Sequence, residues 1–176
     1  MYFGAHGQAN GLDNVLQAMA LVRERPGGQD IRLRLIGEGP LKQELMEQAS
    51  RLGLDSVTFE PSVSKSEIPA LAAQADAFVI AVLALPNLYR YGISMNKLFD
   101  YLAARRPILI ASSASNNPVE DSGAGLTVKP GSPEALAQAI IAIASLSPSE
   151  REKMGERGRA YVEAVSYTHL TLPTKA

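Results

Sequence analysis

The chain has 176 residues, of which 46% are hydrophobic and 20% charged, and its formal net charge at pH 7 is -1. This length and balance are typical of one compact globular domain, and they argue against a nucleic-acid-binding protein. The absence of cysteine excludes disulfides, cysteine-ligated zinc, iron–sulfur clusters and thiol nucleophiles, and the apolar stretches are far shorter than the roughly 20 residues that cross a bilayer, so we expect a cytoplasmic protein without a membrane span.

Short apolar runs alternate with segments of helical periodicity along the chain. This order predicts repeated strand–helix units and a mainly parallel sheet with helices on both faces. The expected strands are residues 2–4, 32–36, 57–60, 77–83, 107–111 and 126–128, and the expected helices are residues 12–23, 41–52, 66–75 and 96–104, with two more beginning after Ser132 and Ser147. We predict an α/β fold with a Rossmann-like, doubly wound sheet of six parallel strands.

The two ends of the chain differ from the ends of a natural domain. Met1 is followed at once by an apolar strand, so we expect the chain to begin within a longer protein. After Ala164 a helical pattern gives way to residues 165–176, which resemble the translation of an adapter used in sequencing libraries. We therefore assign residues 1–164 to a domain and residues 165–176 to a non-native tail, which leaves His6 as the only native histidine.

In an open parallel sheet, a ligand binds at the carboxyl ends of the strands, beside the point where strand order reverses. The loop after the first expected strand, residues 4–11, contains three glycines that let backbone N–H groups approach an anion at a helix N-terminus. A purely structural turn is an open alternative there. Residues 37–40 form either a tight turn or, through Glu38, the place where a dinucleotide-binding fold holds a ribose.

Residues 88–107 form a third loop and the helix after it. A helix that begins near Ser94 places free N–H groups, a hydroxyl and the Lys97 ammonium together, an arrangement that suits a pyrophosphate. Asp100 follows Asn96 by four residues and Lys97 by three, so the three side chains lie on adjoining helical faces and the carboxylate can accept hydrogen bonds from a ribose diol. The alternative is a solvated helix with an asparagine cap and a Lys97–Asp100 pair.

Three motifs at matching intervals carry a resemblance to a known family. They are Gly37-Glu-Gly-Pro40, Gly92-Ile-Ser-Met-Asn-Lys-Leu-Phe-Asp-Tyr-Leu-Ala-Ala-Arg-Arg-Pro107 and Asn117-Pro-Val-Glu-Asp-Ser-Gly-Ala-Gly-Leu126. Over residues 2–164 the chain resembles the carboxy-terminal, donor-binding domain of family-four retaining glycosyltransferases, which have the GT-B fold. Within that family it is most similar to bacterial fucosaminyltransferase-like enzymes of O-antigen and surface-polysaccharide assembly.

The resemblance implies donor-binding roles for particular residues and assigns no catalytic residue. Asp100 corresponds to the second glutamate of the family's paired-glutamate motif, which binds the donor ribose, and Lys97 is similar to the basic residue that neutralises the diphosphate. The first glutamate has no clear counterpart. Ala5 and Asn10 stand where the family has an arginine and a lysine that bind phosphate. The expected donor-binding residues are His6, Gly7, Arg90, Gly92, Ser94, Asn96, Lys97 and Asp100.

We expect Arg90 and Lys97 to supply the missing positive charge, aided by the backbone at His6 and Gly7. The resemblance implies transfer from a nucleoside-diphosphate sugar, expected to be UDP-linked, with retention at the anomeric carbon. We expect no further cofactor, no metal and no nucleic-acid partner. The acceptor would bind a missing N-terminal domain, so the chain alone is expected to be inactive. Location of the intact enzyme at the inner membrane face is an open alternative. A nucleotide-sugar epimerase of the same architecture and a non-catalytic dinucleotide-binding domain remain alternatives.

Overall fold

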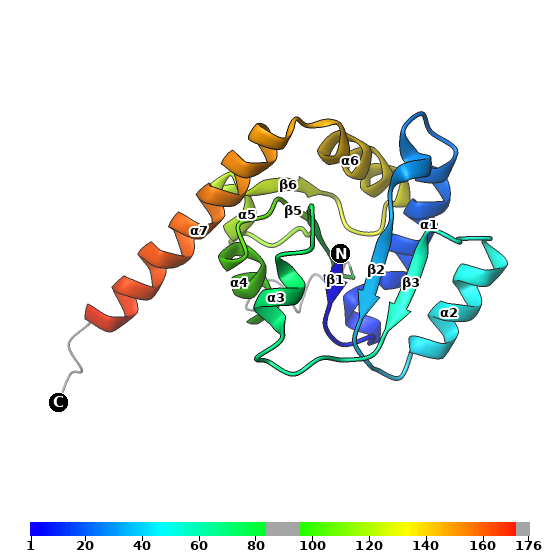
Figure 1. The fold of residues 1–176 in the computed structure, drawn as a ribbon, viewed down its shortest axis with the longest axis horizontal. Coiled ribbons are helices and arrows are strands. Elements are labelled where there is room, and N and C mark those ends of the chain that lie inside the picture. Colours follow the sequence, from blue (N-terminus) through cyan, green and yellow to red (C-terminus); the bar gives the residue numbers. More distant parts are fainter. Residues whose placement is uncertain (84–95, 172–176) are drawn as a thin grey trace.

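The computed structural model describes residues 1–83 and 96–171, and it describes side chains as far as residue 165. The strands are β1 (Tyr2–Phe3), β2 (Leu33–Ile36), β3 (Val57–Glu60), β4 (Phe78–Ala81), β5 (Ile108–Ala111) and β6 (Gly125–Val128). The helices are α1 (Leu12–Arg23), α2 (Lys42–Arg51), α3 (Ile68–Ala72), α4 (Asn96–Ala103), α5 (Pro118–Ser122), α6 (Pro133–Ser145) and α7 (Pro148–Thr171), with 3-10 helices η1 (Gln8–Asn10) and η2 (Gly28–Asp30). Every expected strand and helix is confirmed (Figure 1).

The strands form two three-stranded parallel sheets, ordered β1-β2-β3 and β4-β5-β6, rather than the single six-stranded sheet that we expected. The sheets meet where the Met1 ammonium donates to Ala77 O at 2.8 Å and Val79 N–H donates to Met1 O at 3.1 Å. These two bonds follow the parallel pattern, but β1 has only two residues and is too short to extend a ladder along β4. Strand order reverses between β1 and β4, the kind of position where open α/β sheets bind ligands.

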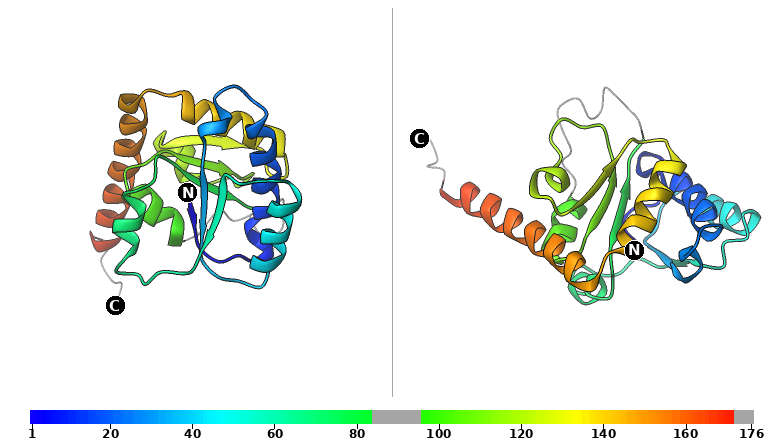
Figure 2. Two further views of the ribbon diagram at one scale, coloured as in Figure 1. Left: turned by 45° about the vertical axis from the view of Figure 1, so that its right-hand side comes forward. Right: turned by 90° about the horizontal axis from the view of Figure 1, so that it is seen from above.

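Alternate strand residues face two separate cores, because successive side chains of a strand point to opposite faces. Val79 and Leu109 lie in the core that α1, α2 and α6 cover, whereas Phe78 and Ile108 lie in the core that α3, α4 and α5 cover. The views in Figure 2 show the strands between helices on either side. Burial on both faces explains why β4 and β5 are continuous apolar runs.

Three helices begin at side chains that accept a hydrogen bond from a free backbone N–H of the first turn. Ser147 Oγ accepts from Glu150 N–H at 3.3 Å, which confirms the predicted start of α7. Ser132 Oγ accepts from Ala135 N–H at 3.2 Å, which confirms the predicted start of α6. Asn117 Oδ1 accepts from Val119 N–H at 3.2 Å and starts α5 in the same way. The α5 helix was not among the predicted elements, although the Asn-Pro pair before it is a typical helix start.

Two helices differ in length from the expected ones. The helix expected at residues 66–75 is confined to α3. At its amino end, both the N–H and the hydroxyl of Ser64 donate to the Glu67 carboxylate and form a turn before the helix. Helix α7 continues to residue 171, beyond the expected boundary at residue 164, and its last turns project from the body of the protein (Figure 1). Whether residues 165–176 are non-native stays a prediction.

Four arginine side chains donate hydrogen bonds to carbonyl groups at the carboxyl ends of neighbouring helices. The last turn of a helix leaves such carbonyls without partners, and its partial negative charge attracts cations. The pairs are Arg23 with Leu52 and Gly53 after α2, Arg106 with Ala73 after α3, Arg157 with Gly123 after α5, and Arg151 with Ala144 and Leu146 at the end of α6. These bonds connect helix ends to other elements of the fold.

Candidate functional site

The loops that follow β1, β2 and β4 are bonded to one another at the carboxyl edge of the sheets. His6 N–H donates to Glu38 O at 2.9 Å, and Leu41 N–H donates to His6 O at 3.0 Å. Leu83 N–H donates to Ala9 O at 3.3 Å, which joins the exit from β4 to the loop after β1. The predicted ligand-binding edge is therefore a connected set of loops at the point where strand order reverses.

The turn at residues 37–40 lies against the loop after β1 at a separation that only glycine permits. A Cβ atom on Gly37 would lie 2.0 Å from Gly4 O, and one on Gly39 would lie 2.5 Å from His6 O. Gly37 also has φ of +144°, a conformation that other residues rarely adopt. The two glycines of this turn therefore have a structural role, since they let the two loops touch.

Glu38, the residue on which the dinucleotide-binding alternative depended, is engaged within its own turn. Its carboxylate forms an ion pair of 2.7 Å with the Lys42 ammonium, which also donates to Gly37 O at 2.9 Å and Glu60 O at 3.0 Å. The hydrogen bond from Lys42 lowers the pKa of the Glu38 carboxyl. The Lys42 side chain thus connects the carboxyl ends of β2 and β3.

Lys97, in the first turn of α4, points back across the loop after β1. Its ammonium donates to the Tyr2 hydroxyl at 3.0 Å and to Asn10 Oδ1, and its nitrogen lies 4.7 Å from the centroid of the Tyr2 ring. Partial burial lowers the pKa of Lys97 to about 8, because the charged form is desolvated. The Lys97–Asp100 pair of the alternative interpretation is not among the ion pairs of the described residues.

His6 is fully buried, with 0% of its surface exposed, beneath the turn at residues 37–40. Its ring lies 6.1 Å from that of Tyr2 and 6.2 Å from that of Phe59, centroid to centroid. Neither ring nitrogen has a hydrogen-bond partner within the described part of the chain. Burial lowers the pKa of His6, and the nearby Lys42 ammonium lowers it further, so the imidazole is neutral at pH 7.

The remaining expected site residues fall into two groups. Asn96 and Asp100 lie on the exposed side of α4, four residues apart, while Lys97 between them turns inward. Gly7 precedes η1, and because the His6 N–H is bonded to Glu38, Gly7 is the better placed of the two to offer a backbone amide. Arg90, Gly92 and Ser94 lie outside the described residues.

The sequence did not predict the two residues that contact the Lys97 ammonium, Tyr2 and Asn10. Tyr2 was read only as a strand residue, and Asn10 only as a position that lacks the family's lysine. Both contact Lys97, from 95 and 87 residues away along the chain. The one signal in the sequence was the neutral Asn10 at a position where the family has a lysine. A neutral residue there leaves room for a cation from another part of the chain.

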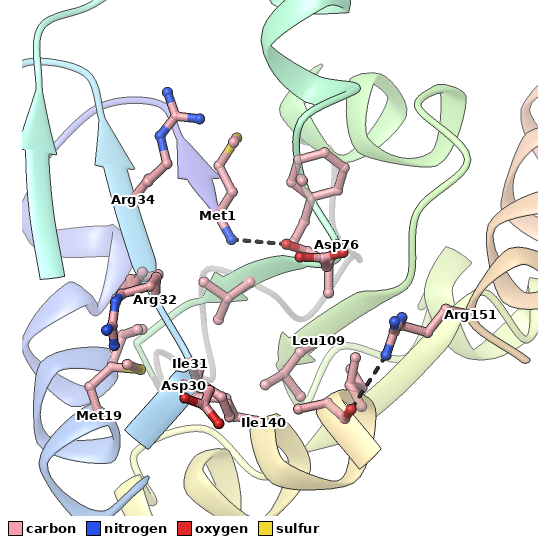
Figure 3. A pocket seen from close by; sticks show the side chains of 18 of the residues that line it. Met1, Met19, Asp30, Ile31, Arg32, Arg34, Asp76, Leu109, Ile140 and Arg151 are labelled. Atoms are coloured by element: carbon pink, nitrogen blue, oxygen red, sulfur yellow. Dashed lines mark hydrogen bonds between the residues drawn. The ribbon is translucent and has the colours of Figure 1, made fainter. Parts of the chain in front are cut away.

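A cavity of about 590 Å³ lies at the opposite, amino edge of the sheets (Figure 3). Val15, Met19, Val79, Leu109, Ile140 and Ile143 supply apolar lining, and the charged residues around it are Asp30, Arg32, Arg34, Asp76 and Arg151. Arg34 is already paired with Glu60 at 2.6 Å. This cavity is on the wrong edge for ligand binding by an open parallel sheet, and the mixed signs of its charges favour neither an anion nor a cation.

Within residues 1–83 and 96–171, no group of three or more His, Asp or Glu side chains is placed to hold a metal ion. None of the helices in that part of the chain is long and apolar enough to cross a membrane.

The family described as "Glycosyl transferases group 1" matches residues 1–145. Among curated proteins, the chain is similar to the colanic acid biosynthesis glycosyl transferase WcaI of Escherichia coli (strain K12), with 30% identity over 80 residues, which make up 46% of this chain and 19% of WcaI. The match thus spans less than a fifth of the curated relative.

Solved structures share the fold at low sequence identity. The catalytic domain of the cholesterol-α-glucosyltransferase of Helicobacter pylori has a TM-score of 0.70 at 20% identity, covering 93% of this chain and 96% of that one. A mutant of S. aureus TarM, crystallised with fondaparinux, α-GlcNAc-glycerol and UDP, has a TM-score of 0.75 at 12% identity, covering 96% of this chain and 34% of that one. The fold resembles the carboxy-terminal, Rossmann-like half of GT-B glycosyltransferases, and the similarities do not favour the epimerase or dinucleotide-binding alternatives.

Proposed function

Because the chain belongs to the glycosyl transferases group 1 family, we propose that it is the donor-binding half of a retaining glycosyltransferase that uses a UDP-linked sugar. The observation that carries this proposal is the Lys97 ammonium, which is held at the carboxyl edge of the sheets by two neutral partners. A partly buried cation that has no carboxylate partner among the described residues is a suitable contact for a diphosphate. The co-crystallised UDP of TarM supports the choice of base by analogy of fold.

The proposed donor site extends along the start of α4 and the loop after β1. Lys97, Ser94 and the free N–H groups of the first turn would hold the diphosphate, and Asp100, exposed one turn later, would accept hydrogen bonds from the ribose. We assign Arg90, Gly92 and Asn96 to the same site from the sequence motif. We assign the remaining two, His6 and Gly7, to the loop beside the diphosphate: Gly7 would offer its backbone amide, and His6, whose ring is fully buried, would support this loop from within rather than touch the ligand.

The proposed chemistry is departure of the nucleoside diphosphate from the anomeric carbon of the donor. Negative charge develops on the leaving phosphate in that step, and the partial positive charge at the N-terminus of α4 together with the Lys97 ammonium would stabilise it. Donors that are already oriented need no rearrangement as the charge develops, which makes them effective. We propose no covalent nucleophile on this chain.

The proposal extends to the intact protein, of which this chain would be one part. We infer an acceptor-binding N-terminal domain, a hexosyl or N-acetylhexosaminyl donor and an acceptor that is a surface polysaccharide or a lipid-linked sugar, in an enzyme of the fucosaminyltransferase-like type. WcaI is named for colanic acid biosynthesis, which agrees with this acceptor class. A chain without the acceptor domain would bind donor without turning it over, and the lack of cysteine fits a cytoplasmic location.

The test is calorimetric titration of the 176-residue chain with UDP, with NADH as the control ligand. We expect saturable binding of UDP, none of NADH, and a clear loss of UDP affinity in Asp100→Ala. Because the Asp100 side chain is exposed, this substitution should leave the fold intact, which circular dichroism would verify. A folded chain that binds NADH in preference to UDP, or binds neither, would contradict the proposal.

A further inference from the structure

We propose that Tyr2 and Asn10 are positioning residues that hold the Lys97 ammonium at one fixed point, and that this point, rather than the residue that carries the charge, is what the donor diphosphate recognises. The inference rests on the proposed function and deepens it. It names two neutral side chains that neither composition nor the helix motif singled out as donor-site residues. Both lie on the loop or strand opposite α4, so the anion site is assembled from two distant parts of the chain.

The two partners are themselves oriented by a common acceptor. The Tyr2 hydroxyl donates to Ala5 O at 2.7 Å, and Asn10 Nδ2 donates to the same oxygen at 3.0 Å. Because the phenol proton and one N–H of the amide are used there, Tyr2 and Asn10 each present an oxygen lone pair to Lys97. The two side chains can therefore both accept from an ammonium.

Tyr2 and Asn10 together accept only part of the hydrogen bonds that the Lys97 ammonium can donate. An ammonium has three N–H donors, and the bonds to Tyr2 and Asn10 use two of them. Neither partner is charged, and within the described residues no carboxylate forms an ion pair with Lys97. The third N–H has no partner within residues 1–83 and 96–165, and we infer that it and the uncompensated charge are available to an anion.

The path of the lysine side chain is fixed by the backbone below it. A Cβ atom on Gly4 would lie 3.1 Å from the Tyr2 hydroxyl and 3.5 Å from Lys97 Cδ, so the lysine stem passes directly over a glycine. Asn10 is the last residue of η1, before Gly11 in the left-handed conformation with φ of 52°. The bond from its Nδ2 to Ala5 O fixes where the amide points. Both ends of the contact are thus set by the loop after β1.

Because Lys97 Nζ and Asn10 Oδ1 are in contact, the tips of the two side chains lie at nearly the same place. A positive charge on residue 10 would therefore stand close to where the charge of residue 97 stands now. The position of the charge can therefore be kept while the residue that bears it is changed. Exchanging the residues at positions 10 and 97 tests the inference directly.

The experiment exchanges the residues at positions 10 and 97 of the 176-residue chain and measures UDP binding by calorimetric titration at pH 7. Lys97→Asn should weaken UDP binding by about 10- to 100-fold, the usual effect of losing a charge-assisted hydrogen bond. The exchanged variant Asn10→Lys/Lys97→Asn should recover most of that loss, to within about fivefold of the parent, since it restores the charge at the same point. Lys153→Asn, an exposed lysine on α7, is the matched control and should not change binding.

The positioning role is tested by the pH dependence of the same affinity. Binding should weaken as the pH rises through about 8, where Lys97 loses its proton, and Tyr2→Phe should move this decline to lower pH because one acceptor of the charged form is gone. A residue that only packs would leave the position of the decline unchanged. In case Tyr2→Phe alters the fold, Asn10→Ala should move the decline in the same direction.

The outcomes separate the inference from the function on which it rests. If the parent chain does not bind UDP, both fail. If the parent binds UDP and Lys97→Asn weakens it, but the folded exchanged variant is as weak as Lys97→Asn alone, the donor-domain proposal stands and the inference is wrong. An unchanged pH profile in both Tyr2→Phe and Asn10→Ala would also refute the positioning role.

Discussion

Replacing His6 with leucine should stabilise the fold, although the residue lies in the predicted binding loop. The wild-type imidazole is fully buried and its two nitrogens have no partner within the described part of the chain. Burying a polar side chain without partners costs about 1–3 kcal/mol, and leucine fills a similar volume with no polar atom. We expect the free energy of unfolding at pH 7.5 to rise by about 1–3 kcal/mol, measured by urea denaturation.

The same substitution should change how stability depends on pH. Burial holds the pKa of His6 below its ordinary 6.5, so in mildly acid solution the unfolded chain binds a proton that the folded chain does not. Stability therefore falls as the pH drops below about 6.5 in the parent chain. The His6 contribution to this fall should be absent in His6→Leu.

His6→Gln separates the two effects, because glutamine keeps a polar side chain but does not titrate. It should remove the acid dependence without the full gain in stability. A loss of more than about 1 kcal/mol in His6→Leu at pH 7.5 would show that the imidazole makes a favourable polar interaction, and our reasoning about unpaired nitrogens would be wrong. If His6→Leu gains stability and loses UDP affinity, the buried imidazole is retained for binding.

Three further substitutions test the fold, each by urea denaturation. Arg105→Gly should gain about 0.5–1 kcal/mol, because Arg105 has φ of +57° and, among the described residues, its side chain has only an exposed 3.4 Å pair with Glu156 to lose; a loss of stability would contradict this. Gly125→Ala should cost about 1–3 kcal/mol, since its Cβ would lie 1.8 Å from Ile108 O, and a neutral result would mean that the β5–β6 ladder adjusts. Leu98→Ala, at a fully buried position in α4, should cost about 2–5 kcal/mol, whereas a cost below 1 would mean that the site collapses around the gap.

The predicted elements agree with the structure because they depend on local patterns. A run of apolar residues such as Ile108–Ala111 reads as a buried strand wherever it pairs, and Ser132 starts a helix through a bond to a residue three positions on. The single sheet was not predictable in detail, because whether β1 forms a ladder with β4 depends on how many residues of each strand come into register.

For the candidate site, the sequence by itself determined the edge of the sheets and the helix start that present Lys97 and Asp100, since both follow from strand order and helical spacing. Only the tertiary structure decided what these side chains contact: Lys97 turns away from Asp100 toward Tyr2 and Asn10, and Glu38 is bound by Lys42. Helical spacing makes both a Lys97–Asp100 pair and a separate Lys97 possible. The choice between them depends on the positions of loops far apart in the chain, which the packing of the two cores brings together and local sequence does not encode.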